Sequence, residues 1–121
     1  MAKVLIVDDS PAQVSSLKAL IEKWGHVVLT AENGDQALQI ARAEQPNVIL
    51  MDVVMPGMSG FQTTRKLSKD QATNRIPVIF VSKKDGEADQ VWGMRQGATA
   101  YVTKPINPDV LFTAISDAVA A

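Results

Sequence analysis

The sequence predicts an α/β fold in which a parallel sheet carries helices on both of its faces. Short apolar runs alternate five times with helical patterns along the 121 residues. The first, third and fourth runs are almost continuously apolar, as expected for central parallel strands that are buried on both sides. The connections between the runs are short, which favours strand–helix–strand units with right-handed crossovers.

The first expected strand is residues 3–7, KVLIV, and the helix that follows it has recognisable ends. Ser10 is a suitable N-cap and Pro11 fits the first helical position, while Gly25 is typical of the residue just past a helix end. One apolar stripe at helical spacing should face the sheet, formed by Val14, Leu17, Ile21 and Trp24.

The other expected strands are residues 27–31, 47–51, 77–81 and 100–103. The helical segment at about residues 86–96 is the weakest, because Gly86 and Gly93 inside it each lower helix stability by about 1 kcal/mol relative to alanine. The last helix has the clearest apolar stripe, formed by Leu111, Ala114, Ile115, Ala118 and Val119.

Five units of this kind fit a five-stranded sheet of order 2-1-3-4-5, the flavodoxin-like doubly wound arrangement. The length suits one domain, so we expect residues 1–121 to form a single domain with no output domain attached. The N-terminal apolar run is too short for a signal peptide and no later stretch approaches a membrane span, so we expect a cytoplasmic protein without membrane contact. A formal net charge of −1 argues against nucleic-acid binding, and zero cysteines exclude disulfides and thiolate metal sites.

Polar side chains occur where the expected strands end. Asp8 and Asp9 follow the first strand, Asp52 the third, Ser82 the fourth and Lys104 the fifth. In a sheet of order 2-1-3-4-5 the carboxyl ends of these strands are neighbours, and ligand sites of open α/β sheets lie there. The sequence therefore predicts that three carboxylates, a hydroxyl and an ammonium group converge at one edge of the sheet.

Each of these residues also has a purely local explanation. One of Asp8 and Asp9 could cap the first helix, although the Ser-Pro pair after them already supplies a helix start, and Asp52 could open the next loop as an Asx turn. Ser82 could begin the following helix, and Lys104 could be a solvated surface charge. The convergence of all these groups favours one shared site over separate local roles.

The predicted group of side chains has a definite chemistry. Carboxylates about 4 Å apart repel by roughly 4 kcal/mol per pair at an effective dielectric constant of about 20, so three of them stay ionised together only beside a counter-charge. Oxygen ligands without histidine or cysteine select a hard cation, and Mg²⁺ binds one or two carboxylates while keeping positions for water and phosphate. Asp52, on a central strand, is then a candidate nucleophile for an aspartyl phosphate.

Four motifs, LIVDDS, ILMDVVMPGMSG, VIFVS and VTKP, resemble in order and spacing those of the receiver domain of bacterial two-component response regulators. The resemblance covers essentially the whole chain and extends to stand-alone regulators of the chemotaxis type. It implies a signalling protein rather than an enzyme, one that promotes its own phosphorylation and dephosphorylation. A histidine kinase would be the phosphodonor, and a downstream protein target would bind the face formed by the fourth helix, fifth strand and fifth helix. We expect the protein to be a monomer.

The resemblance implies that Asp52 is the phosphoacceptor and also a ligand of Mg²⁺. It implies that Asp9 binds the metal directly and that Asp8 acts mainly through a metal-bound water. The backbone carbonyl of Val54 would complete the protein ligands.

The same resemblance implies that Lys104 pairs with the phosphoryl group and that Ser82 hydrogen-bonds it. Tyr101 occupies the position of the family's aromatic switch residue, with plain core packing as the alternative. The peptide bond between Lys104 and Pro105 is usually cis in the family, in keeping with the tolerance of proline for that isomer.

Two lysines depart from the family pattern. The residue after Ser82 is usually small, but here it is Lys83, with Lys84 next. These lysines could favour an incoming phosphodonor, alter dephosphorylation, or form a solvated loop.

Two further features of the sequence could reflect binding to another protein. Residues 85–105 also resemble pilus-motility regulators of the PilH type, and Trp92 in this segment lies either on a signalling face or in the core. Arg65, Lys66 and Lys69 form a basic helix face, which we interpret as solvated in preference to a docking site.

Three other functions compete with a switch. A flavodoxin-type electron carrier is disfavoured, because no hydroxyl-rich phosphate loop follows the first strand and an acidic pocket would repel the FMN phosphate. A phosphatase that forms an aspartyl phosphate needs a second acid two residues after the nucleophile, where this sequence has Val54. A phosphate sink, or a shuttle to a histidine phosphotransfer protein, stays open beside the effector hypothesis.

Overall fold

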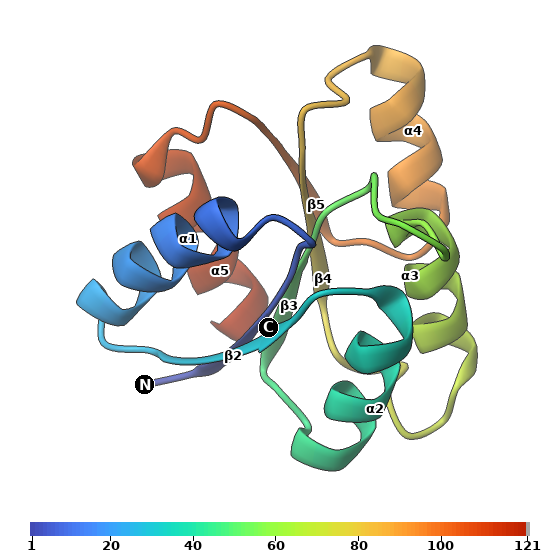
Figure 1. Cartoon of the computed structure of the whole chain (residues 1–121), viewed down its shortest axis with the longest axis horizontal. Helices are drawn as coiled ribbons and strands as arrows, with labels where there is room; N and C mark the ends of the chain where they lie inside the picture. The colour runs from blue at the N-terminus through green and yellow to red at the C-terminus, as the bar shows by residue number, and fades with distance from the viewer. Residues whose placement is uncertain (121) are drawn as a thin grey trace.

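The computed structural model describes residues 1–120, in which five strands and five helices alternate (Figure 1). The strands are β1 (Lys3–Val7), β2 (Val27–Ala31), β3 (Val48–Met51), β4 (Val78–Ser82) and β5 (Ala100–Thr103). The helices are α1 (Pro11–Lys23), α2 (Gly34–Glu44), α3 (Gly60–Lys69), α4 (Glu87–Arg95) and α5 (Pro108–Ala120). Within this range, no helix combines the length and apolar character needed to cross a membrane.

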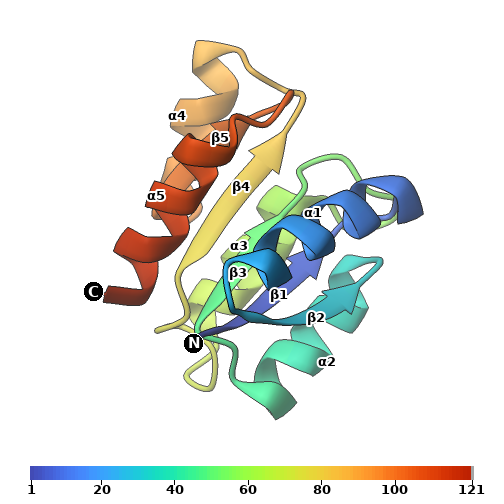
Figure 2. The ribbon, with the colours of Figure 1, turned by 90° about the vertical axis from the view of Figure 1, so that its left-hand side faces the viewer.

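The five strands form one parallel sheet of order β2-β1-β3-β4-β5, so the predicted fold class is confirmed. The predicted single domain runs to Ala121, which lies outside the described residues. Each crossover carries one helix, and the carboxyl ends of all the strands therefore meet at one edge of the sheet (Figure 2).

Helices α1 and α5 cover one face of the sheet, and α2, α3 and α4 cover the other (Figure 1 and Figure 2). Successive residues of a strand point to opposite faces. In β1, Val4 and Ile6 accordingly join the core beneath α1 and α5, whereas Leu5 and Val7 join the core on the other side. Burial on both faces explains why this strand is continuously apolar.

The ends of α1 form as the sequence predicts. Ser10 Oγ accepts a hydrogen bond from the backbone N–H of Gln13, and Pro11 is the first helical residue. Gly25 follows the helix with a φ of +90°, a conformation that glycine adopts without strain. Leu17 and Ile21 of the predicted stripe are buried. Val14 and Trp24, its other two members, are partly buried and pack against the same core.

The predicted stripe of α5 is correct except at its last member. Leu111 and Ile115 are buried and the two stripe alanines pack against the same core, but Val119 in the last turn is exposed. The packed stripe thus ends one residue earlier than the pattern predicts.

Helix α4 has the weak features expected of it, with one correction. Gly86 is its N-cap rather than an interior residue, and it provides no side-chain hydrogen bond to the first turn. Gly93 is the one fully buried residue of the helix. Trp92 is 46% exposed, so the interpretation of this residue as core filler is wrong.

Candidate functional site

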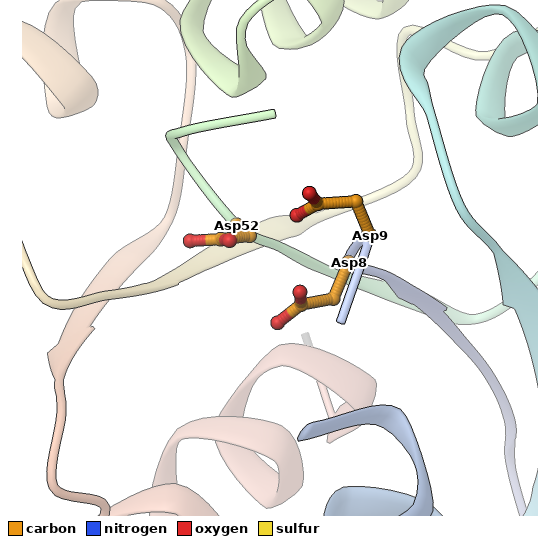
Figure 3. A group of neighbouring side chains, drawn as sticks. All are labelled: Asp8, Asp9 and Asp52. Atoms are coloured by element: carbon orange, nitrogen blue, oxygen red, sulfur yellow. The ribbon is translucent and has the colours of Figure 1, made fainter. Parts of the chain in front are cut away.

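Three aspartates meet where β1 and β3 end (Figure 3). Val7 of β1 pairs with Met51 of β3, so Asp8, Asp9 and Asp52 leave two adjacent strands at the same level. Each offers a carboxylate oxygen, and these oxygens lie within 4.8 Å of one another. The convergence expected from the strand order is therefore present.

Asp8 is buried and uses both of its carboxylate oxygens. Oδ1 accepts a hydrogen bond of 2.9 Å from the N–H of Ser10, which is itself the N-cap residue of α1, so Asp8 does not cap the helix. Oδ2 lies 3.2 Å from Lys104 Nζ, and the Lys104 side chain is only 8% exposed. The interpretation of Lys104 as a solvated surface charge is therefore wrong.

Asp52 lies on the other side of the same ammonium group. Its Oδ1 is 4.0 Å from Lys104 Nζ and accepts a hydrogen bond of 2.9 Å from the N–H of Val53. This bond goes to the next residue, so it is not the Asx turn considered from the sequence, which joins residues two apart. Burial raises the pKa of Asp52 above its ordinary value of 3.8; Lys104 opposes this effect, and the carboxylates of Asp8 and Asp9 add to it.

Ser82 and Tyr101 both form hydrogen bonds with Lys84, in the loop between β4 and α4. Ser82 is buried, and its Oγ accepts a hydrogen bond of 3.1 Å from the N–H of Lys84. The hydroxyl of Tyr101 donates to the carbonyl of Lys84. The Tyr101 ring also packs at a centroid distance of 5.8 Å from Phe80, and burial raises the pKa of the phenol. Tyr101 is therefore both a packing residue and a contact to the loop.

Gly60 is a site residue that the sequence analysis missed. A Cβ atom built on it would lie 2.0 Å from the carbonyl oxygen of Asp52, and its N–H donates to the carbonyl of Val53. Only glycine therefore lets the first turn of α3 approach the backbone of Asp52. The available signal was the glycine directly after the N-cap Ser59.

The side chain of Val54 is exposed, and the peptide bond from Lys104 to Pro105 is cis.

The donor set fits a hard divalent cation. The site has three clustered carboxylates and one buried ammonium group, which lies within 4.0 Å of two of them, so the ionised site carries an excess of negative charge. The set contains no imidazole or thiolate, and oxygen-only ligands favour Mg²⁺ or a similar ion. Asp8 and Asp9, but not Asp52, also line an open pocket of about 530 Å³ between α1 and β2.

The fold and the acidic site are those of a signalling domain. The profile of the response regulator receiver domain matches residues 4–116, and the chain belongs to this family. It is 55% identical to the protein PilH of Pseudomonas aeruginosa, over 96% of each chain. It is 36% identical to PilG of the same organism, over 93% of this chain and 84% of that one.

A solved structure supports the same assignment. The chemotaxis protein CheY4 of Vibrio cholerae superposes with a TM-score of 0.90 at 30% identity, over 98% of each chain. The protein is thus a receiver domain of the two-component type with chemotaxis-type and PilH-like relatives. Receiver domains accept phosphoryl groups from histidine kinases and act on downstream targets.

Proposed function

We propose that this protein is a phosphorylation-gated switch in which Asp52 accepts a phosphoryl group from a histidine kinase in the presence of Mg²⁺. The observation that carries the proposal is the convergence of Asp8, Asp9 and Asp52, two of which also contact the ammonium group of Lys104. A purely structural role does not account for it, because clustered carboxylates with one counter-charge destabilise a fold.

Asp52 is the best-placed acceptor of the three aspartates. Its side chain is 13% exposed, whereas that of Asp8 is almost fully buried and paired with Lys104. Asp52 Oδ2 makes no hydrogen bond to any residue between 1 and 120, so its lone pairs are available to attack phosphorus. The new O–P bond forms as the N–P bond of phosphohistidine breaks, and the electron pair of that bond returns to the imidazole.

The other aspartates and one carbonyl would hold the metal. Asp9 is exposed and pairs with no cation in the described part of the chain, which suits a direct ligand. Asp8, already bonded to Lys104, would contribute less directly, and Asp52 and the backbone carbonyl of Val54 would complete the set. When bound, Mg²⁺ supplies positive charge that stabilises the phosphoryl group during transfer.

Lys104 and Ser82 would hold the phosphoryl oxygens once they are on Asp52. Lys104 Nζ is 4.0 Å from Asp52 Oδ1, so a small side-chain movement away from Asp8 brings it to an oxygen of the new group. Ser82 Oγ accepts from the N–H of Lys84, and its own O–H can be donated to the phosphoryl group at the same time.

Lys84 couples these changes to Tyr101. The N–H of Lys84 donates to Ser82 Oγ and its carbonyl accepts from Tyr101, so a movement of Ser82 toward the phosphoryl group would displace Lys84 and with it the contact to Tyr101. Phosphorylation would therefore shift the loop before α4 and loosen the bond that holds Tyr101, biasing an existing two-state equilibrium. The face of α4, β5 and α5 would then bind a protein target differently.

The cellular setting that we propose is motility control, in a chemotaxis-like or type IV pilus system. The support is the 55% identity to PilH, with PilG and a chemotaxis protein among the other relatives.

The proposal is tested by incubating the protein with Mg²⁺ and acetyl phosphate and measuring the intact mass. We expect the mass increase of one phosphoryl group in the wild type, and no increase in Asp52→Asn or when a chelator removes the metal. A phosphoryl adduct of the same yield in Asp52→Asn would overturn the choice of acceptor.

A further inference from the structure

We propose that the groove between α3 and the C-terminal end of α4 is a docking site for an acidic segment of a partner protein. The groove has a volume of about 480 Å³, and no residue of β5 or α5 lines it. It is lined chiefly by Arg65, Ser68, Lys69, Trp92, Arg95 and Gln96.

The groove is positively charged and lacks internal counter-ions. Arg65, Lys69 and Arg95 line it, and Lys66 lines an adjoining hollow together with Arg65. No carboxylate lines either space, and within residues 1–120 none of these four cations forms an ion pair, although four other cations of the chain do. On a chain with a net charge of −1, such a cluster complements an anionic partner.

Arg65 is already held in place to receive a carboxylate. Its Nε donates a hydrogen bond of 2.8 Å to Oε1 of Gln96, which is 6% exposed and in turn donates to the carbonyl of Trp92. The Nη groups of Arg65 donate to no described residue and remain available for a bidentate contact. Because the side chain is already ordered, binding costs less conformational entropy than at a free surface arginine.

Trp92 adds an apolar element to the site. Its ring is about half exposed, and the guanidinium carbon of Arg65 lies 6.0 Å from the ring centroid. Tryptophan and arginine side chains are enriched among the residues that dominate protein interfaces. The groove therefore fits an acidic peptide that also carries a large aliphatic or aromatic side chain.

Two other occupants fit the groove less well. A nucleic acid usually meets a broad basic surface, whereas this chain is slightly acidic and its unpaired cations here span one short patch. A second copy of the chain could offer its own acidic segment around Glu87 and Asp89, at the start of α4. That contact would join two different surfaces, and such head-to-tail contacts propagate into open filaments unless they close into rings.

The test is an NMR titration of the ¹⁵N-labelled full chain with two synthetic dodecapeptides. One peptide contains Asp-Glu pairs separated by single leucines, and the other has Asn and Gln in place of Asp and Glu. We expect the acidic peptide alone to shift the amides of Ser68, Gln96 and Gly97 and the indole N–H of Trp92.

Two matched double variants distinguish the effect of the groove cations on peptide binding from the effect of the net charge of the protein. Lys69→Gln combined with Arg95→Gln removes two groove cations that form no hydrogen bond or ion pair within the described chain, so the internal bonds stay intact. We expect this variant to bind the acidic peptide about ten-fold more weakly. Lys23→Gln combined with Arg75→Gln makes the same charge change at exposed positions outside the groove and should bind like the wild type.

Four outcomes would overturn the proposal. The first is that the amide shifts are absent, or are equal for the two peptides, and the second is that the Lys23→Gln/Arg75→Gln variant binds the acidic peptide as weakly as the groove variant. The third is that a twelve-nucleotide oligouridine binds more tightly at the same residues. The fourth is that raising the protein concentration alone produces the same shifts. Modification of the groove variant by acetyl phosphate should match the wild type, so this test and that of the phosphorylation switch can fail separately.

Discussion

Replacing Asp52 by asparagine should stabilise the metal-free protein at pH 7, although it removes the proposed phosphoacceptor. Burial and the neighbouring carboxylates raise the pKa of Asp52 above 3.8, so the ionised form is less stable in the folded chain than in the unfolded one. The folded state loses stability as the pH rises between the unfolded and folded pKa values, and the loss persists at pH 7. Asparagine has nearly the same shape and carries no charge.

The size of the effect follows from the burial of Asp52 and from the charges around it. At an effective dielectric constant of about 20, a carboxylate at the 4.8 Å limit repels it by roughly 3 kcal/mol, and Lys104 at 4.0 Å attracts it by roughly 4 kcal/mol. Lys104 therefore offsets the repulsion of the buried Asp8. The exposed Asp9 is screened by water and adds little. Burial of the carboxylate, the largest cause of the raised pKa of Asp52, therefore sets the net destabilisation, which is on the order of 1 kcal/mol. A change of this size raises the melting temperature of such a domain by about 4 °C.

Calorimetric melting of wild type and Asp52→Asn in chelator and low salt measures this difference. The advantage of the variant should shrink as the pH falls through the folded pKa of Asp52, because the wild-type carboxyl then becomes neutral. Added Mg²⁺ should raise the melting temperature of the wild type more than that of the variant. Asp117→Asn, which changes an exposed carboxylate on α5, is the matched control and should have little effect.

The electrostatic reasoning is refuted if metal-free Asp52→Asn melts below the wild type at pH 7, or if its advantage does not change with pH. A lower melting temperature would mean that the contacts of the Asp52 carboxylate with Val53 and Lys104 outweigh its burial and repulsion. An advantage that is independent of pH would mean that it does not arise from the charge.

Four further predictions follow from the site and its surroundings. Asp9→Asn should keep the fold but weaken Mg²⁺ binding on the order of ten-fold, measured by metal-dependent melting, and should slow phosphorylation. Gly60→Ala should cost about 2–4 kcal/mol in denaturant unfolding, because its Cβ would lie 2.0 Å from the Asp52 carbonyl; unchanged stability would contradict the close approach. Tyr101→Phe should lose about 1 kcal/mol with the bond to Lys84, accept phosphate normally and show a weaker shift of the loop before α4 by NMR. Amide exchange should show α4 less protected than α5, and equal protection that phosphorylation leaves unchanged would count against a movable α4.

The fold was predictable because its signals are local and agree with one another. Val4 to Val7 are apolar without interruption since both faces of β1 are covered, and Ser10 and Gly25 mark the two ends of α1 by their own chemistry. Helix α4 was harder, because its one fully buried residue is a glycine and its apolar side chains are exposed. Their hydrophobicity alone does not tell a core side chain from one at a groove, and Trp92 shows this.

The convergence at the site was predictable from strand order, but its internal bonds were not. Strand order places Asp8, Asp52 and Lys104 at one edge, yet only the fold shows Lys104 buried between the two carboxylates. The two hydrogen bonds that Lys84 makes, with Ser82 and with Tyr101, depend on the path of a loop, and no periodicity in the sequence predicts that path. The need for Gly60 likewise arises from a backbone contact across a turn rather than from a pattern in the sequence.

The most direct measurement of the central claim is chemical trapping of the phosphorylated residue. The protein is phosphorylated with acetyl phosphate and Mg²⁺, reduced with borohydride, which converts an aspartyl phosphate to homoserine, and sequenced by tandem mass spectrometry. The proposed switch predicts homoserine at position 52 and at no other aspartate. Homoserine at position 8 or 9, or phosphate retained on Ser82, would contradict it.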